Sequence, residues 1–560
     1  MSLRTNETIE TSIDGSDDEE SFVDLMDMEN LLAIKTLTLA LTPKNDTIGV
    51  KSELTSTLVC ATIKARTLPE ENEHTPVDIV VALDISSSMM GGEKLGLCKL
   101  TIAQLLRNLL PHDRFGLIAY SDDAVIKAHL QFMTTENKQN VLSTVKNLHA
   151  HGSTNISAAI ALSFQELQSV TTPNKIRSIF LLTDGNANRG ITDQEGLTEL
   201  TKNCWNDSKY ANRDTFPWKG DDDTKHVINL RPSVLGLFLD SKKGTTAPTC
   251  DVITKSQDQD LSPVSLLCFG YGTDHNAPML RDISDATETG SYYFVQTDSD
   301  VSSAFGDALG GLVSIVAQSA VLTLIPPSKD VQILCVHHDS AIRREDSSGN
   351  TNGATFTVSL GDFYAEETRD VLIEVTLAST ATPCITEKAP NNGLAHLLAT
   401  LSYTDILKKA PIRSPKPVVC SIARPENDEI SVDNEYISKQ WIRVYATKEM
   451  EEAEKLAEVG QFTDAKRRLQ GVNDLIMKAE RNVRDDVMID QLTKDLQELM
   501  NGFASNVAYY SYGSKQLAHY QQTYKRQRMS TANALTKSPY RTSAKQQFAQ
   551  EFSEETTAKK

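Results

Sequence analysis

The sequence predicts an α/β, doubly wound domain that is inserted in an antiparallel β-sandwich and followed by an α-helical region. Three observations predict this fold. Strand-like and helix-like runs alternate between residues 76 and 317, short strand-like runs lie on both sides of that segment, and helical periodicity returns after residue 431. The length of 560 residues agrees, because a chain of this size exceeds what one core holds.

The alternating segment has two clear strand signals. Residues 77–83 (VDIVVAL) and 177–182 (RSIFLL) are almost wholly apolar, as expected for strands that are buried on both faces of a parallel sheet. Large apolar residues recur at helical spacing over 93–110. Further strands are expected at 114–120, at 124–130 as its antiparallel partner, at 264–269 and at 291–295, and further helices at 137–148, 156–167, 277–286 and 301–317.

The alternation fails between residues 196 and 263, which we interpret as an insertion in the α/β domain with strand-like runs at 227–230 and 234–239. A segment that follows a helix and precedes a strand lies at the amino ends of the sheet strands. Ligands of open α/β sheets bind at the opposite edge. We therefore expect the insertion to lie away from the ligand site.

The flanking strand-like runs predict the sandwich. Residues 37–41 and 54–65 form one pair, and four short runs follow at 321–325, 331–336, 354–360 and 371–377. Neither set would make a well-covered sheet alone. Combining them predicts residues 31–75 and 318–430 as one β-sandwich with its connecting segment, and 76–317 as the inserted domain.

A helical domain is expected over 431–524, with one earlier helix at 394–407. Two helices over 435–479, joined by a turn at 460–464, resemble a single tetratricopeptide-like hairpin, and a third helix is expected over 484–503. Because stacked repeats need about three units, one hairpin does not predict an array. Residues 1–30 and 525–560 are poor in apolar residues, which predicts an acidic and a basic disordered tail.

Composition narrows the class of protein. A formal net charge of -19 argues against binding to nucleic acid. No apolar run approaches the roughly 20 residues of a membrane span, and no secretory signal is recognisable. The eight cysteines lack metal-like spacing, so we expect a reduced protein in the cytoplasm, with the nucleus as an alternative. The opposite charges of the two ends make self-association a further prediction.

Oxygen-bearing side chains follow two of the predicted strands and open a helix. They are Asp84, Ser86 and Ser88 after residues 77–83, Thr154 in a Gly-Ser-Thr turn, and Asp184 after residues 177–182. These positions meet at one edge of a parallel sheet, and an extended Asp-x-Ser-x-Ser stretch would point all three of its side chains the same way. Singly, each residue is a common turn or cap residue. Jointly, three hydroxyls and two carboxylates predict a site for Mg²⁺, with Mn²⁺ and Ca²⁺ as alternatives.

The Asp84-x-Ser86-x-Ser88 motif, Thr154 and the Thr183-Asp184-Gly185 turn resemble the metal-ion-dependent adhesion site of von Willebrand factor type A domains. The resemblance covers residues 76–317 and implies a Rossmann-like fold. It implies that Ser86, Ser88 and Thr154 bind the metal directly, and that Asp84 and Asp184 act mostly through water. It also implies a non-enzymatic scaffold in which the metal engages an exposed Asp or Glu of a partner protein.

The segments FGYGTDH (269–275), SYYFV (291–295) and ALGGL (308–312) also resemble intracellular type A domain proteins of plants and protists. The region 436–479 is similar to the helical region that follows the domain in members with a hedgehog/intein-type module. Other members carry a RING finger and are ubiquitin ligases. This sequence has neither RING spacing nor an intein nucleophile context. Two alternatives stay open, a component of a ubiquitin-type assembly and a metal-dependent hydrolase, although no general base accompanies the site in sequence.

Overall fold

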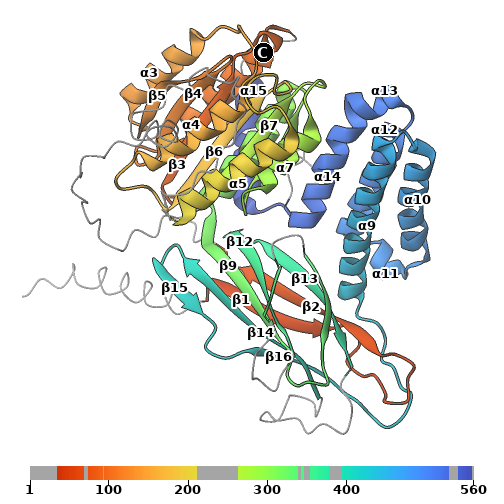
Figure 1. Cartoon of the computed structure of the whole chain (residues 1–560). Helices are drawn as coiled ribbons and strands as arrows, with labels where there is room; N and C mark the ends of the chain where they lie inside the picture. Colours follow the sequence, from red (N-terminus) through yellow and green to blue (C-terminus); the bar gives the residue numbers. More distant parts are fainter. Residues whose placement is uncertain are drawn as a thin grey trace, which may run out of the picture.

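The computed structural model describes residues 35–67, 74–91, 94–210, 263–338, 342–345, 353–377, 394–528 and 540–557. Figure 1 shows three parts. An α/β domain lies at one end, a β-sandwich at the other, and a group of helices beside them. The predicted fold class is confirmed. Among the described residues, the helices are all too short or too polar to cross a lipid bilayer.

The α/β domain is built on a six-stranded sheet in the order β5-β4-β3-β6-β7-β8. Its strands are β3 (Val77–Asp84), β4 (Arg114–Tyr120), β5 (Ala124–Phe132), β6 (Ile176–Thr183), β7 (Val264–Tyr271) and β8 (Ser291–Val295). All neighbours are parallel except β5, which pairs antiparallel with β4 as predicted. Strands β3, β6 and β7 are buried along their whole length, which explains why apolar residues predominate in their sequences.

Helices cover both faces of this sheet (Figure 1). They are α2 (Lys94–Asn108), α3 (Thr135–Lys146), α4 (Ile156–Gln168), α5 (Gln194–Tyr210), α7 (Ala277–Asp285) and α8 (Asp298–Val313). Helix α5 begins at the predicted insertion, yet Leu197, Cys204 and Trp205 are buried in the domain core. The insertion therefore begins later than residue 196. Its predicted strands, 227–230 and 234–239, lie outside the described residues.

The sandwich joins strands from both sides of the α/β domain. One sheet has the order β1-β2-β13-β10, and the other has the order β11-β12-β9-β14-β15 with β16 beside β14. The strands are β1 (Leu37–Pro43), β2 (Ser56–Ala65), β9 (Ile315–Ile325), β10 (Ile333–His337), β11 (Ile342–Glu345), β12 (Thr355–Tyr364), β13 (Thr368–Thr376), β14 (Leu394–Asp405), β15 (Ala410–Arg413) and β16 (Val418–Ile422). Val59 of β2 faces Ile373 of β13. The α/β domain is thus an insertion in this sandwich, as predicted.

One predicted helix is wrong in this region, and another is confirmed but ends earlier than predicted. The predicted helix 394–407 is instead strand β14 over Leu394–Asp405, in which alternate residues Leu397, Ala399, Leu401 and Tyr403 enter the sandwich core. The leucine-rich sequence is equally compatible with a helix. The segment forms a strand because it pairs with β9 on one side and with β15 and β16 on the other, so that alternate side chains face the core. Helix α8 ends at Val313, so the last residues of the predicted helix 301–317 belong to β9.

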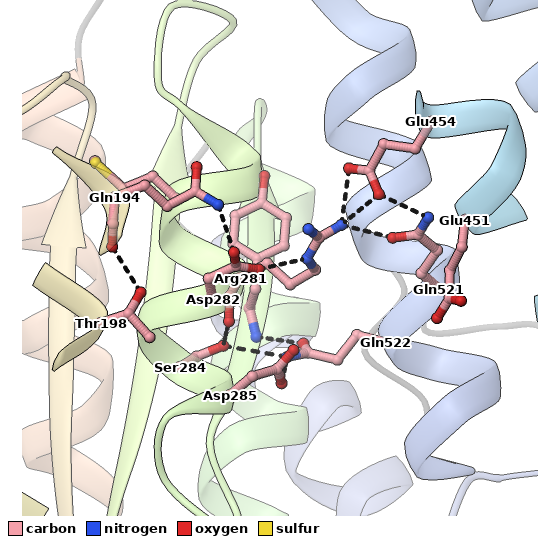
Figure 2. A network of polar contacts seen from close by, with 12 residues as sticks. Gln194, Thr198, Arg281, Asp282, Ser284, Asp285, Glu451, Glu454, Gln521 and Gln522 are labelled. Carbon is pink, nitrogen blue, oxygen red and sulfur yellow. Dashed lines mark hydrogen bonds and ion pairs between the residues drawn. The ribbon is translucent and has the colours of Figure 1, made fainter. Parts of the chain in front are cut away.

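The helical region contains α9 (Glu435–Glu458), α10 (Phe462–Lys478), α11 (Arg481–Arg484), α12 (Val487–Gly502), α13 (Asn506–Ala508), a π-helical turn (Tyr509–Gly513) and α14 (Ser514–Arg526). Helix α14 lies between α9 and the α/β domain (Figure 1), and every residue over 514–524 is buried. In the network of Figure 2, Arg281 of α7 contacts Glu454 of α9 at 2.9 Å and Gln521 of α14 at 2.6 Å. The helical region is therefore docked on the α/β domain by buried polar contacts.

The predicted disordered tail 525–560 is wrong for the residues that are described. Arg528 is buried against Glu367 of the sandwich, and α15 (Ser543–Thr557) packs on α8. A Cβ atom on Gly306 would lie 2.4 Å from the Cα of Ala549, so the glycine allows this close approach. The few apolar residues of α15 are too sparse to predict a buried helix without that partner surface. The other predicted tail, 1–30, lies outside the described residues.

Candidate metal centre

The candidate site begins where β3 ends, with a fully buried Asp84. Its Oδ1 accepts a hydrogen bond from the backbone N–H of Ser86 at 2.8 Å, and its Oδ2 accepts one from the Thr183 hydroxyl at 2.7 Å. Burial raises the pKa of Asp84 to about 6, although both of these hydrogen-bonding partners lower it. The carboxylate is therefore held in one orientation by the last residue of β6 and by the backbone just beyond β3.

The chain does not stay extended after Asp84. Residues Ser87–Met90 form a 3-10 turn, so the predicted extended Asp-x-Ser-x-Ser stretch is wrong beyond Ser86. The hydroxyls still meet, with 3.0 Å between the Oγ atoms of Ser86 and Ser88. Ser86 is buried and Ser88 is exposed. The turn thus gives the site one inner and one outer hydroxyl.

Asp184, at the end of β6, closes this group. Its Oδ1 accepts a hydrogen bond from the Ser88 hydroxyl at 2.8 Å. Thr154 lies on the same side, because a Cβ atom placed on Gly185 would be 3.5 Å from Thr154 Oγ1 and 3.6 Å from Ser88 Oγ. The structure therefore brings all five predicted residues together at the carboxyl edge of the sheet.

The turn that contains Thr154 is stabilised by hydrogen bonds to Asn188, which is not one of the five predicted ligands. The backbone N–H of Thr154 donates to Asn188 Oδ1 at 2.7 Å, and the backbone N–H of Asn188 donates back to the Thr154 carbonyl at 3.1 Å. Gly152 adopts a φ of 78°, a conformation that favours glycine. These contacts fix the threonine hydroxyl next to the two strand ends.

The donor set suits a hard divalent cation. It consists of hydroxyl and carboxylate oxygens, without a nitrogen or sulfur ligand, and four of its five residues are almost completely buried. Mg²⁺ takes six oxygen ligands and keeps some of its water molecules, so three hydroxyls, two carboxylates and solvent at the exposed Ser88 fit its needs. Mn²⁺ and Ca²⁺ accept similar ligands.

Sequence reasoning missed two charged residues beside this group. Lys94 Nζ, on the first turn of α2, lies 2.6 Å from Asp184 Oδ2 and 3.3 Å from Asp274 Oδ2. Burial alone would lower the pKa of Lys94, but the hydrogen bond and charge of Asp184, and then of Asp274, raise it. Lys94 follows Asp84 at the start of the next helix, which is the signal that could have identified it.

Comparisons with known proteins identify the domain that carries these residues. Two models of the von Willebrand factor type A domain match residues 78–204 and 226–294. The inter-alpha-trypsin inhibitor heavy chain H4 of Bos taurus is 32% identical over 144 residues, which are 25% of this chain and 16% of that protein. The E3 ubiquitin-protein ligase WAV3 of Arabidopsis thaliana is 24% identical over 321 residues, 57% of this chain and 33% of that protein.

A solved structure extends the likeness in fold. The von Willebrand factor type A protein from Catenulispora acidiphila aligns with a TM-score of 0.54 at 14% identity, and covers 84% of this chain and 96% of that one. The two family models identify the α/β domain of this chain as a von Willebrand factor type A domain, and the solved structure agrees in fold. The matched segments span a third or less of the length of the two curated relatives, so the likeness concerns only part of each of those proteins.

Proposed function

We propose that this chain is a protein-binding scaffold whose type A domain holds one Mg²⁺ ion, or alternatively Mn²⁺ or Ca²⁺, and uses it to engage an exposed Asp or Glu of a partner protein. The convergence of Asp84, Ser86, Ser88, Thr154 and Asp184 at one sheet edge carries the proposal. The proposed setting is the cytoplasm, and the proposed role is not enzymatic.

The five side chains would have two different roles in this site. The hydroxyls of Ser86, Ser88 and Thr154 bind the ion without cancelling its charge. Asp84 and Asp184 orient those hydroxyls, as the 2.8 Å contact between Ser88 and Asp184 indicates. When bound, the ion supplies an electrophilic coordination position that a carboxylate from outside completes. Lys94 adds a fixed positive charge beside it, which favours an acidic partner.

The test uses the full chain and one matched control. Binding partners are captured with Mg²⁺, with EDTA, and with Asp84→Ala, and the control is Asp123→Ala, which removes an exposed carboxylate from the turn between β4 and β5. Partners that are lost with EDTA and with Asp84→Ala, but kept with Asp123→Ala, would support the proposal. A partner set that is the same under all four conditions would refute metal-dependent binding.

A second candidate rests on the likeness to the ligase WAV3, which extends over 57% of this chain. In that case the chain would be a component of a ubiquitin-type assembly, and another chain would supply catalysis, since this sequence shows no RING spacing. The discriminating measurement is ubiquitin transfer to a captured partner. Transfer that requires this chain together with a separate ligase subunit would favour the assembly, and partner binding without any transfer would favour the simple scaffold.

A further inference from the structure

A second group of side chains of the types that bind metals lies at the other end of the sheet. Asp113 immediately precedes β4, His74 lies just before β3, and the adhesion-site residues follow the opposite ends of β3 and β6. His74 Nε2 is 3.0 Å from Asp113 Oδ2, and His112 Nε2 is 4.0 Å from Asp113 Oδ1. One ligand atom from each of the three residues lies within 4.8 Å of the other two.

Backbone hydrogen bonds fix the orientation of the Asp113 carboxylate, as a metal ligand requires. Its side chain is completely buried, and its two oxygens accept backbone hydrogen bonds from Val77 at 3.1 Å and from Leu110 at 2.6 Å. Burial raises the pKa of Asp113, and the neighbouring histidines lower it. The backbone thus fixes the carboxylate while leaving it lone pairs toward the two rings.

The two imidazoles face the same carboxylate. Their ring centroids are 5.3 Å apart in an edge-on arrangement. An ion pair with Asp113 accounts for His74, whose side chain is 12% exposed. No such close ion pair accounts for His112, whose Nε2 lies 4.0 Å from the carboxylate. This nitrogen is shielded from solvent and makes no hydrogen bond with any described residue, although the side chain as a whole is 32% exposed. A shielded ring nitrogen without a hydrogen bond, beside a buried carboxylate, is an arrangement that a metal ion satisfies.

We propose that His74, His112 and Asp113 bind a Zn²⁺ ion, or another ion that prefers nitrogen ligands, at a site separate from the adhesion-site metal. Two imidazole nitrogens and one carboxylate oxygen are a usual ligand set for Zn²⁺, with water as the fourth ligand on the side where His112 reaches solvent. His74 lies on the connection from sandwich strand β2 to β3. The bound ion would therefore cross-link this connection to the turn between α2 and β4.

The chemistry of the two sites allows them to be tested separately. The full chain is stripped of metal and titrated calorimetrically with Zn²⁺ in excess Mg²⁺, which occupies the all-oxygen site. We expect one Zn²⁺ per chain. His74→Ala and His112→Ala should each weaken its binding by at least about 100-fold, because loss of an outer-shell partner alone costs about 10- to 100-fold. The matched control is His149→Ala, which removes an exposed histidine outside the cluster.

Asp184→Ala separates this inference from the proposed function. It should abolish Mg²⁺-dependent partner binding and leave the Zn²⁺ titration unchanged. A visible Co²⁺ spectrum of the unmutated chain, with the intensity of a four- or five-coordinate site, gives a readout that does not depend on how the variants fold. The inference is overturned if the chain takes up no stoichiometric Zn²⁺ in excess Mg²⁺, or if both histidine variants bind Zn²⁺ as tightly as the unmutated chain.

Discussion

Lys94 Nζ lies 2.6 Å from Asp184 Oδ2, so a cation of the protein itself is paired with a carboxylate of the candidate metal site. The pair is partly buried, with the lysine side chain 15% and the aspartate side chain 0% exposed. Charges this close interact strongly when solvent is largely excluded. The ammonium therefore lowers the net negative charge of the site and would compete with the proposed divalent cation for the same carboxylate.

Removing that charge should tighten metal binding. We predict that Lys94→Met raises the affinity for Mg²⁺ by about three- to tenfold, because one unit of positive charge is lost beside the ion. Isothermal calorimetry measures this directly. Lys127→Met, at an exposed position of β5, makes the same change in net charge and should leave the affinity unchanged. A weaker affinity in Lys94→Met would show that the lysine acts mainly by orienting Asp184.

Loss of a proposed hydroxyl ligand should change the effect of Mg²⁺ on the melting temperature. An ion that binds only the folded chain stabilises it by about 2.7 kcal/mol at 100 times its dissociation constant. We predict that Mg²⁺ raises the melting temperature of the unmutated chain and that Thr154→Ala abolishes this rise. Ser87→Ala is the matched control, because Ser87 lies within the same motif but is not one of the five predicted ligands. A rise that survives in Thr154→Ala would contradict the proposed ligand set.

The contact between Arg281 and Glu454 should stabilise the docked helical region. Their side chains are 16% and 12% exposed, and breaking such a pair leaves a poorly solvated charge. We predict that Arg281→Met lowers the free energy of unfolding by about 3 kcal/mol in urea titrations. Arg467→Met removes an exposed pair with Asp464 and should cost less than about 1 kcal/mol. Equal losses in the two variants would argue against a stabilising role of the interface.

Glycine allows α15 to lie close to α8. A Cβ atom on Gly306 would overlap the backbone of Ala549, and one on Gly310 would lie 2.8 Å from the Cα of Lys545. We predict that Gly306→Ala destabilises the chain by about 1 to 3 kcal/mol and exposes α15 to proteases. Gly471→Ala, in α10, meets no atom within 4 Å and should instead stabilise by roughly 0.5 to 1 kcal/mol. Stabilisation by both changes would mean that α15 is not packed on α8.

A buried histidine predicts acid sensitivity. His275 is fully buried with its Nε2 2.6 Å from the hydroxyl of Tyr292, and burial, followed by the charge of Lys515, lowers its pKa from 6.5 to about 3. Between these values the unfolded chain binds a proton that the folded chain does not. Stability therefore falls as pH drops below 6.5, by roughly 1.4 kcal/mol per pH unit from this group.

The measurement compares pH profiles of unfolding free energy. His275→Gln should have a shallower decline between pH 6.5 and pH 4 than the unmutated chain, whatever its stability at neutral pH. His149→Gln replaces an exposed histidine and should keep the original slope. Identical slopes in the unmutated chain and in His275→Gln would show that another group causes the acid sensitivity.

The sequence by itself determined the type A domain and its five candidate ligands. Apolar runs such as 77–83 identify strands that are buried on both faces, and the ligands directly follow strands or open a helix. Both signals are local, because the side chains that produce them are neighbours along the chain. The convergence of Asp84 and Asp184 then follows from the parallel pairing of β3 and β6.

The tertiary structure alone decided the features that depend on distant partners. Strand β14 has a sequence compatible with a helix, and α15 has too few apolar residues to predict burial. Lys94 contacts Asp274, and His74 contacts Asp113, only because the fold brings distant segments of the chain together. The local sequence specifies the secondary structure that a segment prefers, whereas the burial and charge environment of each residue depend on what packs against it. For this reason the second candidate metal site could be seen only in the folded chain.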